Sequence, residues 1–180
     1  MRTWEADIIA ANAHKGQVDK IGVPYIEHVR MVSAGLAEFS EPVRVAGLLH
    51  DVVEDTDETL ESLRAAGVTE ISLEIIDAVT KVPGSTKREQ IERVILGGYA
   101  ALLVKTSDNA HNSRPDRLKH LDGPTRERLE AKYKEARQAM WAYLATEDIR
   151  SILKIVNPSL LPELREHEAR SAKGVQWAEG

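Results

Sequence analysis

The chain has 180 residues, 42% of them hydrophobic and 29% charged, which is the composition of one soluble globular domain with a sizeable core. Its net charge of −5 argues against a duplex-binding protein, and no apolar run approaches the roughly 18 residues that span a membrane. The absence of cysteine excludes disulfides and thiolate metal sites, and acids interrupt the N-terminal segment, so we expect no export signal and a cytoplasmic location.

Apolar residues recur at helical spacing along most of the chain. Steps of three and four residues join Trp4, Ile8 and Ala11, then Ile26, Val29, Val32 and Leu36, and then Val45, Leu48, Leu49, Val52 and Val53. Further helices are predicted at 57–66, 70–80, 86–96, 99–111, 124–144 and 148–156. All seven prolines fall between these segments or in a first turn, where proline is tolerated.

These patterns predict an all-α fold for residues 1–164, with about eight to ten helices in one bundle. Residues 165–180 are polar, and we expect them to form a surface tail. Trp177 within that tail would dock on the body of the protein or on a neighbouring molecule.

Side chains suited to chemistry are densest in the segment Gly47-Leu48-Leu49-His50-Asp51-Val52-Val53-Glu54-Asp55. An apolar helix here runs into a His-Asp pair and then a Glu-Asp pair, and such groups are costly to bury unless they are paired or bound to metal. On a helix, Glu54 would lie one turn after His50, so one face would present a metal-binding pair with acids just beyond it. The alternative is a capped helix end followed by solvated acids.

Two other segments also bring ionisable side chains out of apolar stretches. His28 opens a predicted helix, and Asp108 follows the apolar run Ala101-Leu102-Leu103-Val104. Taken singly, His28 would be a core histidine and Asp108 a capping or salt-bridged aspartate. Together with His50 and Asp51 they predict a mixed imidazole–carboxylate site, which suits Mn, Fe, Zn or Mg better than Ca.

The order His28, His50-Asp51, Asp108 resembles the HD phosphohydrolase superfamily. The surrounding motifs look like the hydrolase domain of RelA/SpoT proteins over residues 10–145. They are Ala13-His14-Lys15-Gly16-Gln17, Gly22-Val23-Pro24-Tyr25-Ile26-Glu27-His28, the segment from Leu48 to Thr56, Lys105-Thr106-Ser107-Asp108, and His111-Asn112-Ser113-Arg114. Because no synthetase or regulatory domain follows, the chain resembles the stand-alone small alarmone hydrolases.

This resemblance implies a guanosine 3′,5′-bis(diphosphate) 3′-pyrophosphohydrolase, which converts (p)ppGpp to GDP or GTP and pyrophosphate with one Mn²⁺ ion. It also implies roles for individual side chains and a small nucleotide as the binding partner, and it leaves a homodimer open. The implied metal ligands are His28, His50, Asp51 and Asp108, the implied catalytic acids are Glu54 and Asp55, and Asn112 would contact the nucleotide sugar. Lys20 and Arg114 are candidates to face phosphate, and Tyr25 is either a pocket wall or a core aromatic; with Asn112 these are the predicted substrate contacts.

Two positions depart from the family pattern. Asp19 stands where the family usually has an arginine that packs on guanine, and Asn109 stands where an arginine commonly follows the metal aspartate. Both keep open a different phosphorylated nucleotide as substrate, such as NADPH or a nucleoside monophosphate. A non-catalytic nucleotide-binding module is a third reading, but the ligands and the Glu-Asp pair are all present. We expect His14 to be structural and assign no role to His111.

Overall fold

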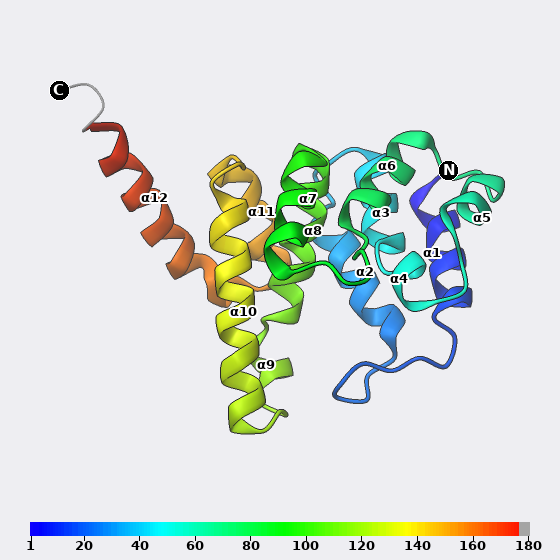
Figure 1. Cartoon of the computed structure of the whole chain (residues 1–180), viewed down its shortest axis with the longest axis horizontal. Helices are drawn as coiled ribbons and strands as arrows, with labels where there is room; N and C mark the ends of the chain where they lie inside the picture. Colours follow the sequence, from blue (N-terminus) through cyan, green and yellow to red (C-terminus); the bar gives the residue numbers. More distant parts are fainter. Residues whose placement is uncertain (177–180) are drawn as a thin grey trace.

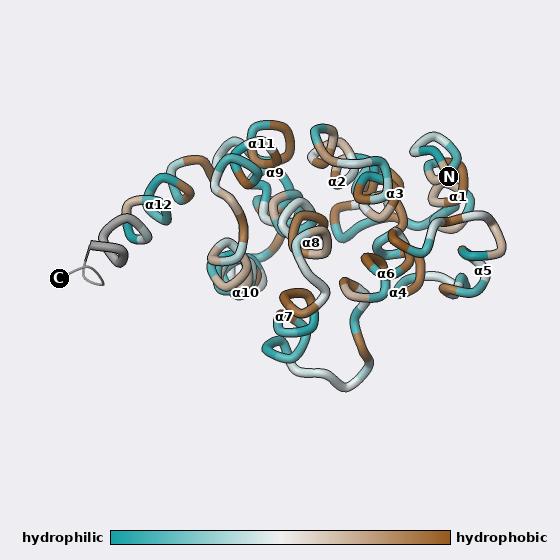
Figure 2. Tube along the Cα trace, turned by 90° about the horizontal axis from the view of Figure 1, so that it is seen from above, coloured by the Kyte–Doolittle hydropathy of each residue, from teal (hydrophilic) through white to brown (hydrophobic). Residues whose placement is uncertain are grey.

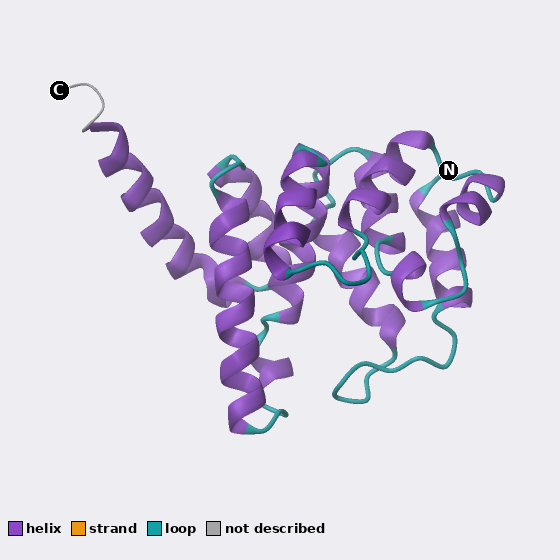
Figure 3. Ribbon diagram, viewed as in Figure 1, coloured by secondary structure: helices purple, strands orange, loops and turns teal. Residues whose placement is uncertain are grey.

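The computed structural model describes residues 1–176, and these residues are helical with no strand, as predicted (Figure 3). The helices are α1 (Thr3–Ala13), α2 (Tyr25–Gly35), α3 (Glu41–Leu49), α4 (Val52–Asp55), α5 (Leu60–Ala65), α6 (Glu70–Val79), α7 (Lys87–Leu96), α8 (Tyr99–Asn112), α9 (Pro115–Leu118), α10 (Gly123–Trp141), α11 (Thr146–Val156), a 3₁₀ turn (Pro158–Leu160) and α12 (Leu161–Gln176). None of the described helices has the length and apolarity needed to cross a bilayer.

Helix α8 is the central element of the fold. It packs against α2, α3, α6, α7, α10 and α11, and ten of its 14 residues are buried. Gly35 lets α2 approach α8 and α11 closely, because a Cβ at this position would collide with Val156 and Ser107. The Ser107 hydroxyl donates a hydrogen bond of 2.8 Å to the Val32 carbonyl and thereby holds α2 and α8 in register. The side chains that these helices carry are therefore fixed relative to one another.

Helix α7 is set apart from the other central helices. Seen from above, the chain leaves α6, loops away from the body and returns through α7, which packs against α8 and α10 (Figure 2). A capping box at Thr86 and Glu89 defines where α7 begins. This excursion leaves a cavity between the α2–α4 side of the molecule and the wall formed by α7 and α10.

Each predicted helix has an observed counterpart, α9 and α12 lie where no helix was predicted, and two predicted segments differ in their bounds. The helix predicted at 57–66 begins only at Leu60, because Thr59 caps it through the Ser62 N–H. The helical pattern from Val45 to Val53 is broken after Leu49. There the His50 ring Nδ1 contacts the Gly47 carbonyl at 2.9 Å, which a continuing helical turn would otherwise use.

Helix α12 extends away from the bundle (Figure 1). It crosses the boundary predicted at residue 165, and its first turns contact the body: Arg137 pairs with Glu163, and the His167 ring lies 5.8 Å from that of Trp141. The separation of residues 165–180 as a tail stays a prediction. Trp177 lies outside the described residues.

Candidate active site

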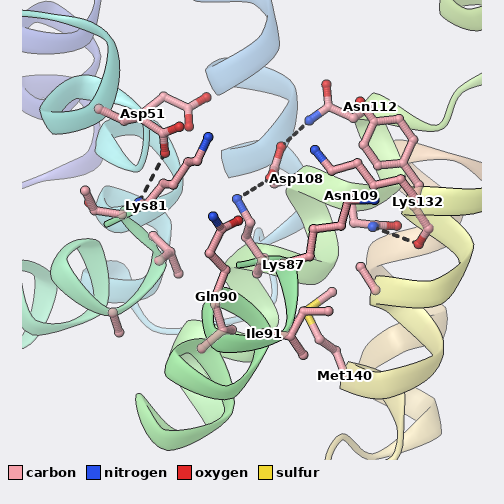
Figure 4. Close-up of a pocket in the computed structure, with 18 of the residues that line it drawn as sticks. Asp51, Lys81, Lys87, Gln90, Ile91, Asp108, Asn109, Asn112, Lys132 and Met140 are labelled. Atoms are coloured by element: carbon pink, nitrogen blue, oxygen red, sulfur yellow. Dashed lines mark hydrogen bonds and ion pairs between the residues drawn. The ribbon is translucent and has the colours of Figure 1, made fainter. Parts of the chain in front are cut away.

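Two of the predicted metal ligands, Asp51 and Asp108, line a cavity of about 260 Å³, and the rings of His28 and His50 contact these carboxylates from the buried side. In Figure 4, Asp51 and Lys81 lie on one side of this cavity, Asn109, Asn112 and Lys132 lie on the other, and Asp108 lies between them. The polar side chains that line the cavity are Tyr25, Asp51, Glu54, Asp55, Thr80, Lys81, Lys87, Gln90, Lys105, Asp108, Asn109, Asn112, Lys132, Tyr133 and Glu135.

Three structural elements supply the predicted ligands. His28 lies in the first turn of α2, His50 and Asp51 follow the end of α3, and Asp108 projects from α8. The Nε2 atoms of His28 and His50 lie 3.3 Å and 3.0 Å from Asp51 Oδ2. They lie 3.4 Å and 3.8 Å from Asp108 Oδ1. All four side chains are buried, and the structure brings them together; their role as metal ligands stays a prediction.

The donor set fits a divalent cation. Among the described residues, the Nε2 atoms of His28 and His50 make no hydrogen bond, although carboxylate oxygens lie close to both. Buried polar atoms without a partner are rare, and here two of them point at the same place as two carboxylates. His28, His50 and Asp51 can offer one ligand atom each within 4.8 Å of one another. Two imidazoles and two carboxylates suit a first-row transition ion.

The outer nitrogens of both imidazoles are held by the protein. His50 Nδ1 lies 2.9 Å from the Gly47 carbonyl, and His28 Nδ1 lies 2.6 Å from His111 Nδ1. Burial and the neighbouring His28 lower the pKa of His111 to about 3, so its ring is neutral and has one accepting nitrogen. We assign the proton of this contact to His28, which leaves its Nε2 free to bind metal. His111 had no role in the sequence interpretation, because only the packing of α2 on α8 reveals the contact.

The charged groups of this cluster shift the pKa values of one another. Although burial alone would raise the pKa of the Asp51 carboxyl, the neighbouring His50 holds it well below its usual range. Lys105 does the same for the pKa of Asp108. Burial would lower the pKa of His50, but the negative charges of Asp51 and Asp108 raise it to about 10. Asp51 and Asp108 are therefore negatively charged, and the His50 ring takes up a proton at the position where a cation would bind.

The predicted catalytic acids line the same cavity on α4. Glu54 Oε2 accepts a hydrogen bond from the Lys81 backbone N–H at 3.2 Å, and the Asp55 carbonyl accepts one from Gln17 at 2.9 Å. Gln17 also contacts the buried His14 ring at 2.8 Å. These bonds give the His14–Gln17 segment a structural task, since they attach the loop before α2 to the turn that carries the two acids.

Two of the four predicted substrate contacts line the cavity. Tyr25 donates its hydroxyl proton to Asp51 Oδ2 at 2.8 Å, and burial together with Asp51 raises the pKa of this phenol. Asn112 donates to Asp108 Oδ1 at 2.5 Å. Lys20 is exposed in the loop before α2, and Arg114 pairs with Asp116 at 2.8 Å, so neither contributes to the cavity lining. Their substrate roles stay predictions.

The two departures from the family pattern have structural partners of their own. Asp19 accepts hydrogen bonds from the backbone N–H groups of Ile21 and Val23, both at 2.9 Å, and pairs with Arg117 at 2.8 Å. Asn109 donates to the Tyr133 carbonyl at 3.0 Å. Both side chains therefore hold the framework of the site together, Asp19 in the loop and Asn109 between α8 and α10.

Comparisons with known proteins agree with this geometry. A GTP pyrophosphokinase of Streptomyces coelicolor is 37% identical over 116 residues, which cover 59% of this chain and 14% of that protein. The guanosine-3′,5′-bis(diphosphate) 3′-pyrophosphohydrolase of Mus musculus is 36% identical over 121 residues, 61% of this chain and 66% of that protein. The chain thus spans a small part of the bacterial relative and about two thirds of the mouse protein.

A solved structure gives the same result for the fold. It is described as a metazoan orthologue of SpoT that hydrolyses ppGpp and plays a role in starvation responses, and it matches with a TM-score of 0.71 at 26% identity. The match covers 84% of this chain and 93% of that one. The resemblance to RelA/SpoT hydrolases is confirmed by these relatives. The family model of the HD domain matches residues 6–146, and the chain therefore belongs to the HD domain family.

Proposed function

We propose that the protein is a Mn²⁺-dependent pyrophosphohydrolase that converts (p)ppGpp to GDP or GTP and pyrophosphate. The observation that carries this proposal is the convergence of two unpartnered imidazole nitrogens on two carboxylates that line one cavity together with Glu54 and Asp55. Relatives named for this activity, among them the mouse protein, support the choice of substrate. A nucleotide substrate also accords with the cytoplasmic location expected from the sequence.

The cation would be held by His28, His50, Asp51 and Asp108. When bound, it supplies positive charge that polarises the phosphoryl group and acidifies the attacking water. Tyr25 and Asn112 hold the two carboxylates in place through their hydrogen bonds. Glu54 and Asp55 lie just outside this set, where a carboxylate can orient water and accept its proton. The chain therefore supplies a metal site, fixed ligands and a base.

The decisive experiment is a panel of phosphorylated nucleotides incubated with Mn²⁺, with the products separated by chromatography. We expect pyrophosphate and GDP from ppGpp. Orthophosphate as the only product, or removal of a 2′-phosphate alone, would refute the alarmone assignment and leave an HD phosphohydrolase of other specificity.

A second substrate class is another phosphorylated nucleotide, such as NADPH or a nucleoside monophosphate. Asp19 favours it, because this side chain is engaged with Arg117 and cannot pack on guanine as the family arginine does. The variant Asp19→Arg tests the point. It should raise the preference for ppGpp over its adenine analogue if this position reads the base, and an unchanged ratio would exclude that role.

A further inference from the structure

Lys105 is the lysine of the cavity that lies next to the predicted metal site. Its side chain is 32% exposed, and its Nζ lies 2.8 Å from Asp108 Oδ2. The lysines at positions 81, 87 and 132 also line the cavity, but all three are exposed and make no ion pair with any described residue. An exposed lysine without a partner does not hold its charge at one position, whereas the ion pair with Asp108 holds that of Lys105.

The position of Lys105 follows from helix geometry. Lys105 and Asp108 are three residues apart on α8, so their side chains share the face that lines the cavity. The neighbouring residues Val104 and Thr106 are buried at 0% and 1% exposure, which prevents this part of α8 from rotating. The ammonium group therefore extends into the cavity from a part of α8 that is fixed by packing.

The ammonium group keeps unused hydrogen-bonding capacity. It has three N–H donors, and Asp108 accepts from one side of it, so donors remain for a group inside the cavity. The ion pair with Asp108 fixes this ammonium group at the edge of the predicted metal site. It therefore places hydrogen-bond donors beside the position that a phosphoryl group would occupy.

We propose that Lys105 is a catalytic residue that donates hydrogen bonds to the phosphoryl oxygens of the group being cleaved. This inference rests on the proposed function. In that reaction a water oxygen bonds to the phosphorus attached to the 3′ oxygen, and the bond between this phosphorus and the 3′ oxygen breaks. The 3′ oxygen keeps the electron pair and gains a proton, and the hydroxyl of the water leaves with pyrophosphate. Lys105 would offset negative charge on the oxygens of the transferred group.

The alternative is that Lys105 only neutralises Asp108 and positions it for the metal. The two roles predict opposite effects on metal affinity. If Lys105 acts on the substrate, Lys105→Met removes a cation next to the ligands, and Mn²⁺ should bind at least as tightly as in the wild type. If it positions Asp108, Mn²⁺ binding should weaken.

The experiment compares Lys105→Met, Lys105→Arg and the control Lys134→Met, an exposed lysine of α10 outside the cavity. We measure Mn²⁺ affinity and the affinity of the Mn²⁺-loaded protein for inorganic pyrophosphate by calorimetry, and kcat and KM with ppGpp. For Lys105→Met we expect a loss in kcat of roughly 10²–10³-fold, the range for removal of one fixed donor. We also expect weaker pyrophosphate binding with no loss of Mn²⁺ affinity. Lys105→Arg should recover part of the kcat and part of the pyrophosphate affinity. Lys134→Met should match the wild type.

Two results would overturn the inference. One is a Lys105→Met protein that loses Mn²⁺ affinity and regains wild-type kcat at saturating Mn²⁺. The other is unchanged pyrophosphate affinity in that variant. Failure of the proposed function would look different, because the wild type itself would then release no pyrophosphate from ppGpp. The calorimetric comparison with pyrophosphate would then still show whether Lys105 binds a phosphoryl group.

Discussion

The contact between His28 and His111 makes a prediction about metal affinity. His28 and His111 are 2% and 6% exposed, so water cannot replace the bond between their Nδ1 atoms when His111 is changed to leucine. A buried donor left without a partner costs about 1–3 kcal/mol. Loss of such an outer contact typically weakens metal binding by about 10–100-fold, or about 1.4–2.7 kcal/mol. We expect His111→Leu to weaken Mn²⁺ binding within that range.

The matched variant is His111→Asn, whose amide oxygen can take the place of the accepting ring nitrogen. It should retain most of the affinity. Calorimetric titration of Mn²⁺ into each protein measures the effect, and thermal unfolding of the metal-free proteins shows whether the fold itself has been weakened. Wild-type Mn²⁺ affinity in His111→Leu would refute the reasoning, because His28 would then need no partner to stay aligned.

Three further predictions follow from the site and the packing. Glu54→Gln and Asp55→Asn keep the shape of each side chain and remove its charge. If either residue activates water, its variant should lose roughly 10²–10⁴-fold in turnover and still bind metal. Near-normal turnover in both variants would show that these residues are surface acids. The raised pKa of His50, about 10, means that its proton must leave when a metal binds. Mn²⁺ affinity should therefore rise between about pH 6 and pH 8, with proton release seen as a dependence of the binding heat on buffer ionisation, and equal heats in all buffers would contradict this. Gly35→Ala forces a methyl group against α8 and α11 and should lower the free energy of unfolding by about 1–3 kcal/mol in denaturant titration, whereas an unchanged midpoint would show that these helices can separate.

The sequence predicted the long helices and grouped the four residues that the structure brings together, because both depend on local signals. Apolar spacing marks the buried face of helices such as α8, and a His-Asp pair at the end of an apolar helix is costly unless it has a use. The break after Leu49 was missed, since it depends on the His50 ring contacting the Gly47 carbonyl, which helical periodicity does not reveal.

Contacts between segments that are far apart in the sequence could not be predicted from it. His28 and His111 are 83 residues apart and meet only because α2 packs on α8. The pairing of Asp19 with Arg117 likewise joins the loop before α2 to α9, a four-residue helix whose periodicity is too short to detect. Arg114 was predicted to contact the substrate, but α8 ends at Asn112 and the Arg114 side chain pairs with Asp116 instead.

Different helices supply the predicted metal ligands and the opposite wall of the cavity, so substitutions on that wall need not disturb the ligands. The predicted metal ligands come from α2, the end of α3 and α8. The facing wall comes largely from α7 and α10, which carry Lys87, Gln90 and Lys132 (Figure 4). Residues such as Lys87, Gln90 and Lys132 on that wall are partly or fully exposed and contribute little to the core, so they can be replaced at low cost in stability. A library confined to α7 and α10 would therefore vary what the cavity accepts while keeping the chemistry constant. Under the proposed function, the same architecture would let new nucleotide preferences arise by substitution on one wall alone.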